Sequence, residues 1–223
     1  NTCVHSKATQ EGMFVGSSGS ISSSVCAIHV FSPQSKTELE IAAVSCLQSS
    51  PAGDCSDDVH GPIGEWDVSR VTDMSAMFLS ESLFKGDISK WDVSKVEDMS
   101  AMFWSAKLFN GDIWTWDVSK VTDMGHMFMG ATSFTGDVSK WDVSRVTDLS
   151  HTFANTNFKS DISEWDVARV KDMNGMFARS QFDGDISKWD VSRVTHMSTM
   201  LQGTLSSATP FDGDISKWDV SKV

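Results

Sequence analysis

The sequence has no excess of basic residues and no long apolar run. Its 18 Lys and Arg residues are outnumbered by 30 Asp and Glu residues, which gives a formal net charge of -12. Because phosphate binding requires a basic surface, this balance argues against nucleic acid as a partner and disfavours an anionic membrane surface. No apolar run approaches the ~20 residues that a membrane span requires, so we expect no direct membrane insertion.

The sequence also lacks the short motifs that carry catalysis or cofactor binding. It contains no Gly-x-Ser-x-Gly nucleophile motif, no phosphate-binding loop and no isolated pair of acidic residues outside its repeating pattern. The pattern is broken by an insertion at 202–210 and by the odd pair Trp104 and Trp114, and neither break adds a catalytic group. We therefore expect a protein that is not an enzyme and needs no cofactor.

Cysteine is confined to the first 55 residues. The four cysteines are Cys3, Cys26, Cys46 and Cys55. No Cys-x-x-Cys pair exists and the spacings of 23, 20 and 9 residues match no zinc pattern, which leaves metal binding as the weaker alternative. An even number in one small region predicts a disulfide framework, with Cys46–Cys55 favoured by its short loop, and hence an oxidising compartment.

What the sequence has in abundance is one repeated unit. The triplet Trp-Asp-Val begins at Trp66, Trp91, Trp116, Trp141, Trp165, Trp189 and Trp218. The steps between triplets are 25, 25, 25, 24, 24 and 29 residues. A period in this range predicts a solenoid, because one such unit cannot bury its apolar face alone and must stack on its neighbours. We expect about seven rungs over residues 61–223, the last of them incomplete.

Aligned on tryptophan, the rungs share two sets of apolar positions. One set, Ile-x-x-Trp-x-Val, has the spacing of a leucine-rich-repeat strand and predicts one parallel sheet with neighbouring rungs ~4.8 Å apart. The other set, Val-x-x-Met-x-x-Met-Phe, recurs every three residues and predicts a short helix or 3₁₀ turn on the outer side. The expected fold class is therefore an α+β solenoid, a leucine-rich-repeat-like stack with the Met and Phe columns in its core.

Residues 1–60 are expected to form an N-terminal cap region. The segment 25–31 reads as one or two strands inside a loop rich in Ser and Gly. Ser35-Lys36-Thr37-Glu38 matches the capping box and predicts a helix over about 36–48. Its apolar face comprises Leu39, Ala43, Cys46 and Leu47, broadened by Ile41 and Val44. Since a solenoid needs a terminal cap, we expect this disulfide-tied helix to cover the first rung.

The complete rung, Ile-Ser-Lys-Trp-Asp-Val-Ser-Lys-Val-Glu-Asp-Met-Ser-Ala-Met-Phe-Trp-Ser-Ala-Lys-Leu-Phe from residue 88, resembles the BspA-like leucine-rich repeat family. In particular it resembles the Trp-Asp-Val-Ser variety first described in mycoplasma surface lipoproteins of unknown function. The resemblance covers roughly residues 61–223. It implies a curved or rod-like solenoid on a secreted or cell-surface protein, associated with adhesion and protein binding and with no enzyme activity.

Aspartate recurs in three columns of the repeat. The column after tryptophan comprises Asp67, Asp92, Asp117, Asp142, Asp166, Asp190 and Asp219. Oxygen ligands at regular spacing favour a hard cation, so calcium bound between rungs, at Asp67, Asp92, Asp117 and Asp142, is one hypothesis. The alternative, which we favour, is that each Asp caps a turn by accepting backbone amides. A Lys or Arg three residues after each of these aspartates would neutralise the column and argues against calcium.

Two histidines occupy one column of adjacent rungs. His126 and His151 are 25 residues apart, so their rings are expected within ~5 Å of each other if strand-like spacing extends there. Two imidazoles could hold a metal ion, but no third ligand recurs beside them. We interpret the column as a variable surface position.

The sequence therefore favours a secreted or cell-surface recognition and adhesion scaffold that binds other proteins or glycans through its solenoid face. The column just before tryptophan varies in charge beside core columns that do not vary, as expected of an exposed contact surface. This variable column comprises Glu65, Lys90, Thr115, Lys140, Glu164, Lys188 and Lys217. The alternative is a structural subunit of a larger extracellular or organellar assembly, which would dock through an open C-terminal end.

Overall fold

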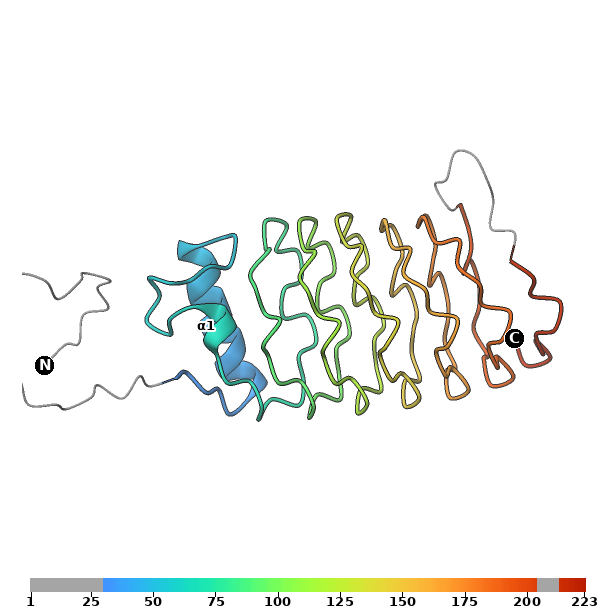
Figure 1. Ribbon diagram of the computed structural model, residues 1–223, viewed down its shortest axis with the longest axis horizontal. Helices are drawn as coiled ribbons and strands as arrows, with labels where there is room; N and C mark the ends of the chain where they lie inside the picture. The colour runs from blue at the N-terminus through green and yellow to red at the C-terminus, as the bar shows by residue number, and fades with distance from the viewer. Residues whose placement is uncertain (1–29, 204–212) are drawn as a thin grey trace, which may run out of the picture.

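The computed structural model describes residues 30–203 and 213–223, and Figure 1 shows rungs that follow one another from the blue helix α1 to the red C-terminal region. Within the described residues the regular elements are the helix α1 (Lys36–Ser49) and the 3₁₀ turn η1 (Ile63–Glu65). Cys3, Cys26, residues 25–29 of the segment 25–31 expected to form strands, and most of the 202–210 insertion lie outside the described residues, and the described residues 30 and 31 are not in a strand.

Helix α1 begins where the capping box predicted it. The Ser35 hydroxyl accepts a hydrogen bond from the Glu38 amide at 3.3 Å, which satisfies one of the free amides of the first turn. The Glu38 carboxylate accepts from the Gln34 amide at 2.7 Å and not from that of Ser35, so the reciprocal half of the box is shifted by one residue. The predicted bounds, 36–48, are confirmed to within one residue.

The buried face of α1 is narrower than predicted. Leu39, Ala42, Ala43, Cys46 and Leu47 are buried and belong to the same core cluster as the rungs. Ile41 and Val44 are 64% and 56% exposed, so their expected contribution to the stripe is wrong. The helix offers one narrow face to the stack, and these two side chains lie beyond it.

A disulfide joins Cys46 to Cys55, as the short loop between them predicted. Their Cα atoms lie 5.1 Å apart, and the bridge links the last turns of α1 to the segment that leads into the first rung. Both residues are buried in the common core. The bridge therefore fixes the position of the helix relative to the stack.

No sheet forms within the described residues, so the expected α+β solenoid with one parallel sheet is wrong. The positions expected to be strands are successive turns, in which the Trp91 amide donates to the Ile88 carbonyl at 3.1 Å. The Asp87 and Asp92 carboxylates accept the amides of Ser89 and Ser94, both at 3.0 Å. These side-chain hydrogen bonds bend the backbone every five residues. They also occupy amides that, in a strand, would donate to the carbonyls of the neighbouring strand.

The backbone bonds between rungs lie instead on the Met-x-x-Met-Phe side. The Met74 and Phe78 amides donate to the Asp98 and Met102 carbonyls of the next rung at 2.9 and 2.8 Å. The intervening Met77 amide turns back to Met74 within its own rung, at 3.3 Å. Amides that donate to the next rung thus alternate with amides that donate within their own rung. As a result only isolated parallel bridges form, such as that between Asp73 and Asp98.

The helix or 3₁₀ turn expected on this side does not form either. Two residues per rung have a left-handed φ there. The first of each pair are Ala76 (57°), Ala101 (55°), His126 (62°), His151 (53°), Gly175 (56°) and Thr199 (58°), and the second are Ser80 (65°), Ser105 (60°), Gly130 (72°), Asn155 (56°), Arg179 (55°) and Gly203 (62°). A right-handed helix cannot continue through such a residue. Each left-handed residue reverses the local turn, and its own amide can donate to the adjacent rung, as that of Ala76 does to the Ser100 carbonyl at 2.8 Å.

Tryptophan bonds the rungs together on the other side. Each indole N–H from the second rung on donates to a backbone carbonyl in the preceding rung, as Trp91 does to Ile63 at 2.9 Å and Trp141 to Ile113 at 3.2 Å. The rings are buried, so these hydrogen bonds lie out of water. The side chains thus supply the cross-rung bonds that a sheet would have supplied on this side.

Phenylalanine columns fill the opposite part of the core, as predicted. Phe78 stacks on Phe103 of the next rung with ring centroids 5.6 Å apart, and on Phe84 of its own rung at 3.9 Å. The same pairs recur through the stack, and the rings are buried. At about 1.5–3 kcal/mol for each large apolar side chain buried, these columns stabilise every rung-to-rung contact.

Candidate recognition surfaces

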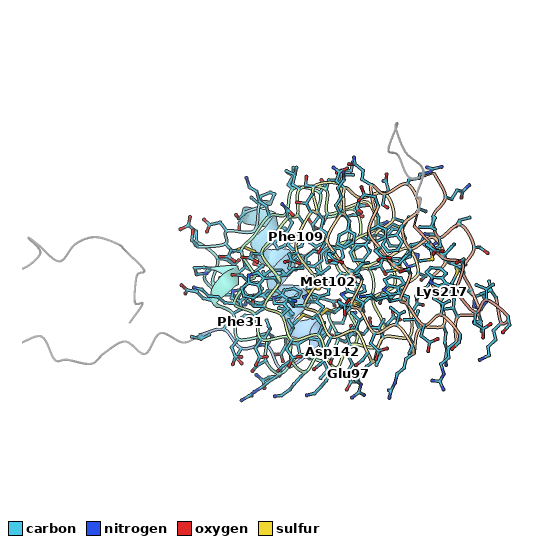
Figure 2. The ribbon with its side chains drawn as sticks, turned by 45° about the vertical axis from the view of Figure 1, so that its right-hand side comes forward. Phe31, Glu97, Met102, Phe109, Asp142 and Lys217 are labelled. Atoms are coloured by element: carbon cyan, nitrogen blue, oxygen red, sulfur yellow. A yellow bond between two sulfur atoms is a disulfide. The ribbon has the colours of Figure 1, made fainter. Side chains whose placement is uncertain are left out.

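The variable column is exposed in every rung. Glu65, Lys90, Thr115, Lys140, Glu164, Lys188 and Lys217 all project into solvent. The next residue in each rung is a tryptophan held by its indole hydrogen bond, so a rigid backbone carries the variable side chains. In Figure 2 the labelled Met102 and Phe109 lie inside the stack, whereas Glu97 and Asp142 lie at its edge.

Opposite charges meet within this column. The Lys188 ammonium lies 2.7 Å from the Glu164 carboxylate of the preceding rung, and this hydrogen bond raises the pKa of Lys188. Both side chains are well exposed, so the pair contributes little to the stability of the fold. The column therefore varies in charge without anchoring the fold.

The aspartates after tryptophan cap turns, as the favoured interpretation held. Asp142 accepts the Ser144 amide at 3.0 Å, and the hydrogen bonds with Ser144 hold the pKa of Asp142 below its ordinary value. Asp67, Asp92 and Asp117 accept amides two residues on in the same way. No group of three or more His, Cys, Asp or Glu side chains suited to a metal ion occurs in the part of the chain that the structure describes. The calcium hypothesis therefore has no set of ligands to support it.

The basic column expected to neutralise these aspartates forms no ion pair with them within 4.0 Å among the described residues. The Arg70 guanidinium, for example, donates to the Gln34 side chain instead. Turn hydrogen bonds are the leading cause of the lowered pKa of Asp67 and of Asp190, and the charges of Arg70 and Arg193 add smaller contributions.

A second aspartate column lies along the backbone bridges between rungs, and we call it the acidic ladder. It comprises Asp73, Asp98, Asp123, Asp148 and Asp172, all partly exposed. Burial raises the pKa of Asp123, and the neighbouring Asp148 and Asp98 raise it further. The ladder thus concentrates like charges at the spacing of one rung.

Basic residues meet the acidic ladder at its ends. The Lys36 ammonium of α1 lies 3.2 Å from the Asp73 carboxylate and also donates to the Ser75 hydroxyl. At the other end His196 occupies this column in place of aspartate, and its backbone forms a parallel bridge with the backbone of Asp172. Among the described residues, no Lys or Arg forms an ion pair with a ladder aspartate beyond Asp73.

The two histidine rings lie next to each other, tilted by 32°, beside the acidic ladder. The His126 and His151 ring centroids are 5.0 Å apart, which confirms the predicted spacing. The Trp104 ring stacks on His126 at 5.2 Å. Burial lowers the pKa of His126, and His151 lowers it further. A Cβ on Gly175 would come within 2.3 Å of the His151 ring, so only glycine leaves room for this stack in the next rung.

Large apolar side chains are exposed on the rungs nearest α1. Trp104 is 37% exposed and Leu79, at the same position of the preceding rung, is 42% exposed. Leu83 and Leu108 are exposed in the turn that follows. Sequence reasoning noted Trp104 as an irregularity but did not connect it with the histidines, because its partner lies one rung away.

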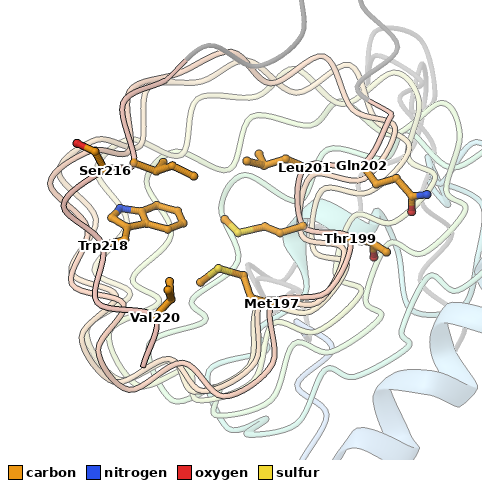
Figure 3. A pocket seen from close by; sticks show the side chains of 9 residues that line it. Met197, Thr199, Leu201, Gln202, Ser216, Trp218 and Val220 are labelled. Carbon is orange, nitrogen blue, oxygen red and sulfur yellow. The ribbon is translucent and has the colours of Figure 1, made fainter. Parts of the chain in front are cut away.

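The variable column and the histidine column lie on opposite sides of the stack. The end-on view of Figure 3 shows Ser216 and Trp218 on one side of the rung and Thr199 and Gln202 on the other. Lys217, of the variable column, lies between Ser216 and Trp218, and Thr199 belongs to the histidine column. Between the two sides is an apolar pocket of about 630 Å³, lined by core positions such as Met197 and Trp218.

Comparison with protein families finds one whose description is Mycoplasma protein of unknown function, DUF285, and it matches residues 50–157 and 135–223. The chain belongs to this family. No curated protein and no solved structure matches the DUF285 chain. Within the described residues of this DUF285 chain, no helix is long and apolar enough to cross a membrane.

Proposed function

We propose that this DUF285 chain is a non-enzymatic recognition and adhesion scaffold that binds other proteins or glycans through the variable column. One observation carries the proposal: the column is exposed at all seven positions while the adjoining tryptophans are buried or, for Trp218, partly buried. Charge can therefore vary there without any change in the core. Its ion pair, Lys188 with Glu164, is exposed, which supports the expectation that substitution on this surface costs the fold little.

The proposal includes a secreted or cell-surface location and kinship with the BspA-like repeats of the Trp-Asp-Val-Ser variety. The Cys46–Cys55 bridge supports an oxidising compartment. The repeated buried tryptophans support the kinship, although the turns that replace the strand depart from a leucine-rich repeat. The aspartates after each tryptophan, two residues from the variable column, accept backbone amides, which suits a rigid contact surface better than a catalytic one.

The test compares two double charge reversals with the same net charge. Lys140→Glu/Lys188→Glu alters the variable column, and Lys107→Glu/Lys159→Glu alters exposed lysines elsewhere in the rung. Fluorescent wild-type protein is screened against printed glycans and purified surface proteins, and the affinity for each hit is measured for both variants.

We expect the first variant to weaken binding by about tenfold or more and the second by less than about twofold, because charges at a contact act at short range. The thermal midpoint of both should stay near that of the wild type, since solvent-facing substitutions shift stability by less than ~0.5 kcal/mol. Equal losses in both variants, no loss in the first, or a collapse of its fold would reject the variable column as the contact surface.

The alternative, a structural subunit of a larger assembly, is favoured by the apolar pocket around Met197, Leu201 and Trp218. A docking subunit should show a mass that rises with concentration in light scattering. Leu201→Glu should abolish that rise if the pocket is the docking surface. A wild-type mass that stays monomeric at every concentration would count against this alternative.

A further inference from the structure

The side of the stack opposite the variable column carries a second surface with a different chemistry. We call it the acidic–aromatic face, and it comprises Asp98, Asp123 and Asp148 with Leu79, Trp104 and His126. We propose that this face binds a lysine- or arginine-rich polypeptide segment that also carries apolar side chains. This partner is distinct from the one assigned to the variable column, and the proposal stands independently of that function.

The charge of the face calls for a cation. Asp98, Asp123 and Asp148 follow one another at the spacing of one rung, and among the described residues no Lys or Arg pairs with any of them. The raised pKa of Asp123 reflects its burial and then the repulsion by its two neighbours. The nearest imidazole, His126, has a lowered pKa, because burial and His151 oppose its charging, and does not neutralise them at neutral pH. A cationic partner would relieve this repulsion.

The chain itself shows how a lysine binds here. At the first rung the Lys36 ammonium contacts the Asp73 carboxylate at 3.2 Å and the hydroxyl of Ser75, two residues on. The second rung presents the same pair of acceptors, Asp98 with Ser100, and both are partly exposed. In the fourth rung the Asp148 carboxylate is partly exposed, whereas Ser150 is buried. A partner's lysine side chains would therefore meet an arrangement that already holds one ammonium group.

The third rung leaves space between these two sites. It has Gly125 where the first, second and fourth rungs have serine, and a Cβ there would lie 3.1 Å from an Asp148 oxygen, 3.2 Å from an Asp123 oxygen and 3.2 Å from the Ser150 hydroxyl. Glycine thus places no side chain between the two partly exposed carboxylates. A long basic side chain crossing the face would meet both.

The apolar half of the face fits a polypeptide better than a small cation. Trp104 is exposed and held in place by stacking on His126, and Leu79 is exposed on the adjacent rung. Aliphatic stems of Lys and Arg cover such surfaces, and an Arg guanidinium also stacks on tryptophan. A metal ion would use only the carboxylates, and an anionic membrane would be repelled by them.

The first test uses a labelled ten-residue peptide of alternating lysine and valine as the probe. Asp98→Asn/Asp123→Asn/Asp148→Asn removes the charge of the face, and Asp92→Asn/Asp117→Asn/Asp142→Asn is the matched control on the other side. Both change the net charge equally, and asparagine can still accept the turn amides. We expect the face variant to bind the peptide about tenfold more weakly and the control to lose less than about twofold. Equal losses, or no binding to the wild type at low salt, would overturn the proposal.

The second test concerns the apolar half. The chain offers two exposed tryptophans on opposite sides, Trp104 and Trp114. Trp104→Ala should weaken binding of the lysine–valine peptide by about fivefold or more, as an exposed aromatic anchor does, and Trp114→Ala should not. A peptide of alternating lysine and serine should bind both variants and the wild type alike. Binding that is insensitive to Trp104→Ala, or competition by millimolar calcium alone that abolishes it, would show that the face is only a site for cations and would overturn the proposal.

Discussion

At the scale of single residues, the column in which an aspartate lies decides what its charge does to stability. Asp142 sits in an exposed turn, and its hydrogen bonds with Ser144 favour the ionised form. Asp123 sits in the acidic ladder, where burial and the neighbouring carboxylates disfavour it. Ionisation of aspartate therefore stabilises the fold on one side of the rung and destabilises it on the other.

Asp123→Asn should raise the thermal midpoint at neutral pH. The raised folded-state pKa of Asp123 means that the folded chain holds this proton more tightly than the unfolded chain, so stability falls as pH rises above the ordinary value of 3.8. The variant cannot ionise and escapes that loss, and its advantage should disappear in acid, where the wild-type carboxyl is protonated.

Asp142→Asn is the control with the opposite sign. Its lowered pKa means that ionisation stabilises the fold above the ordinary value of 3.8 and that this stability is lost as pH falls through the folded-state pKa. The variant should therefore have a lower midpoint than the wild type at neutral pH. Calorimetry from acid to neutral pH measures both, and a destabilised Asp123→Asn at neutral pH would contradict the repulsion within the acidic ladder.

Trp141→Phe should destabilise the protein by about 0.5–1.5 kcal/mol, because it removes the indole hydrogen bond to the buried Ile113 carbonyl, which keeps its bond from the Trp116 amide. Trp114→Phe, at an exposed position, should change stability by less than ~0.5 kcal/mol. Denaturant titration followed by fluorescence separates the two. Equal effects would mean that the indole bond between rungs does not stabilise the stack.

Much at the residue scale could be predicted from the sequence, because a repeat displays its core as columns. The burial of the Ile, Trp, Val, Met and Phe columns is confirmed for the rungs before Met197, and the His126–His151 distance is confirmed as well. In the last rung Ile215 and Val220 are exposed. The indole bonds between rungs were not predicted, because the spacing of tryptophan shows that it is buried and not which carbonyl its N–H meets. The stack of Trp104 on His126 was missed for the same reason.

At the scale of elements, local signals succeeded where they acted within one segment. The capping residue Ser35 predicted the start of α1, and the short loop between Cys46 and Cys55 predicted the disulfide, because capping and short loop closure depend on neighbours in sequence. The sheet was predicted wrongly, because Ile-x-x-Trp-x-Val fits a strand as well as a series of turns. The aspartate after each tryptophan, with its serine two residues on, was the signal for turns.

Removing the bridge should loosen one end of the stack and leave the rest intact. Cys46→Ser/Cys55→Ser should lower the stability of α1 by about 2–3 kcal/mol, as expected for a short disulfide loop. Each rung contacts only its neighbours, so the increase in hydrogen exchange should be confined to α1 and the first rungs. An increase that is uniform out to Trp165 would show that the stack unfolds as one unit.

At the scale of the whole molecule, two surfaces of different chemistry share one rigid core. The variable column lies on the tryptophan side, and the acidic–aromatic face lies on the side of the left-handed residues. Each side is bonded from rung to rung by different groups, indoles on one and backbone amides on the other. Substitutions on one surface should therefore leave the other surface in place, which is what a scaffold with two partners requires.

The central claim is that backbone amides join the rungs on the Met-x-x-Met-Phe side and not on the tryptophan side. Hydrogen exchange of the free protein, resolved by mass spectrometry of short peptides, tests it most directly. Amides in residues 99–105, which donate to the next rung or within their own, should exchange far more slowly than those in residues 87–95, where exposed aspartate side chains accept two of them. The reverse order, with the slowest exchange in residues 87–95, would indicate a sheet on the tryptophan side and contradict the claim that the backbone bonds between rungs lie on the Met-x-x-Met-Phe side.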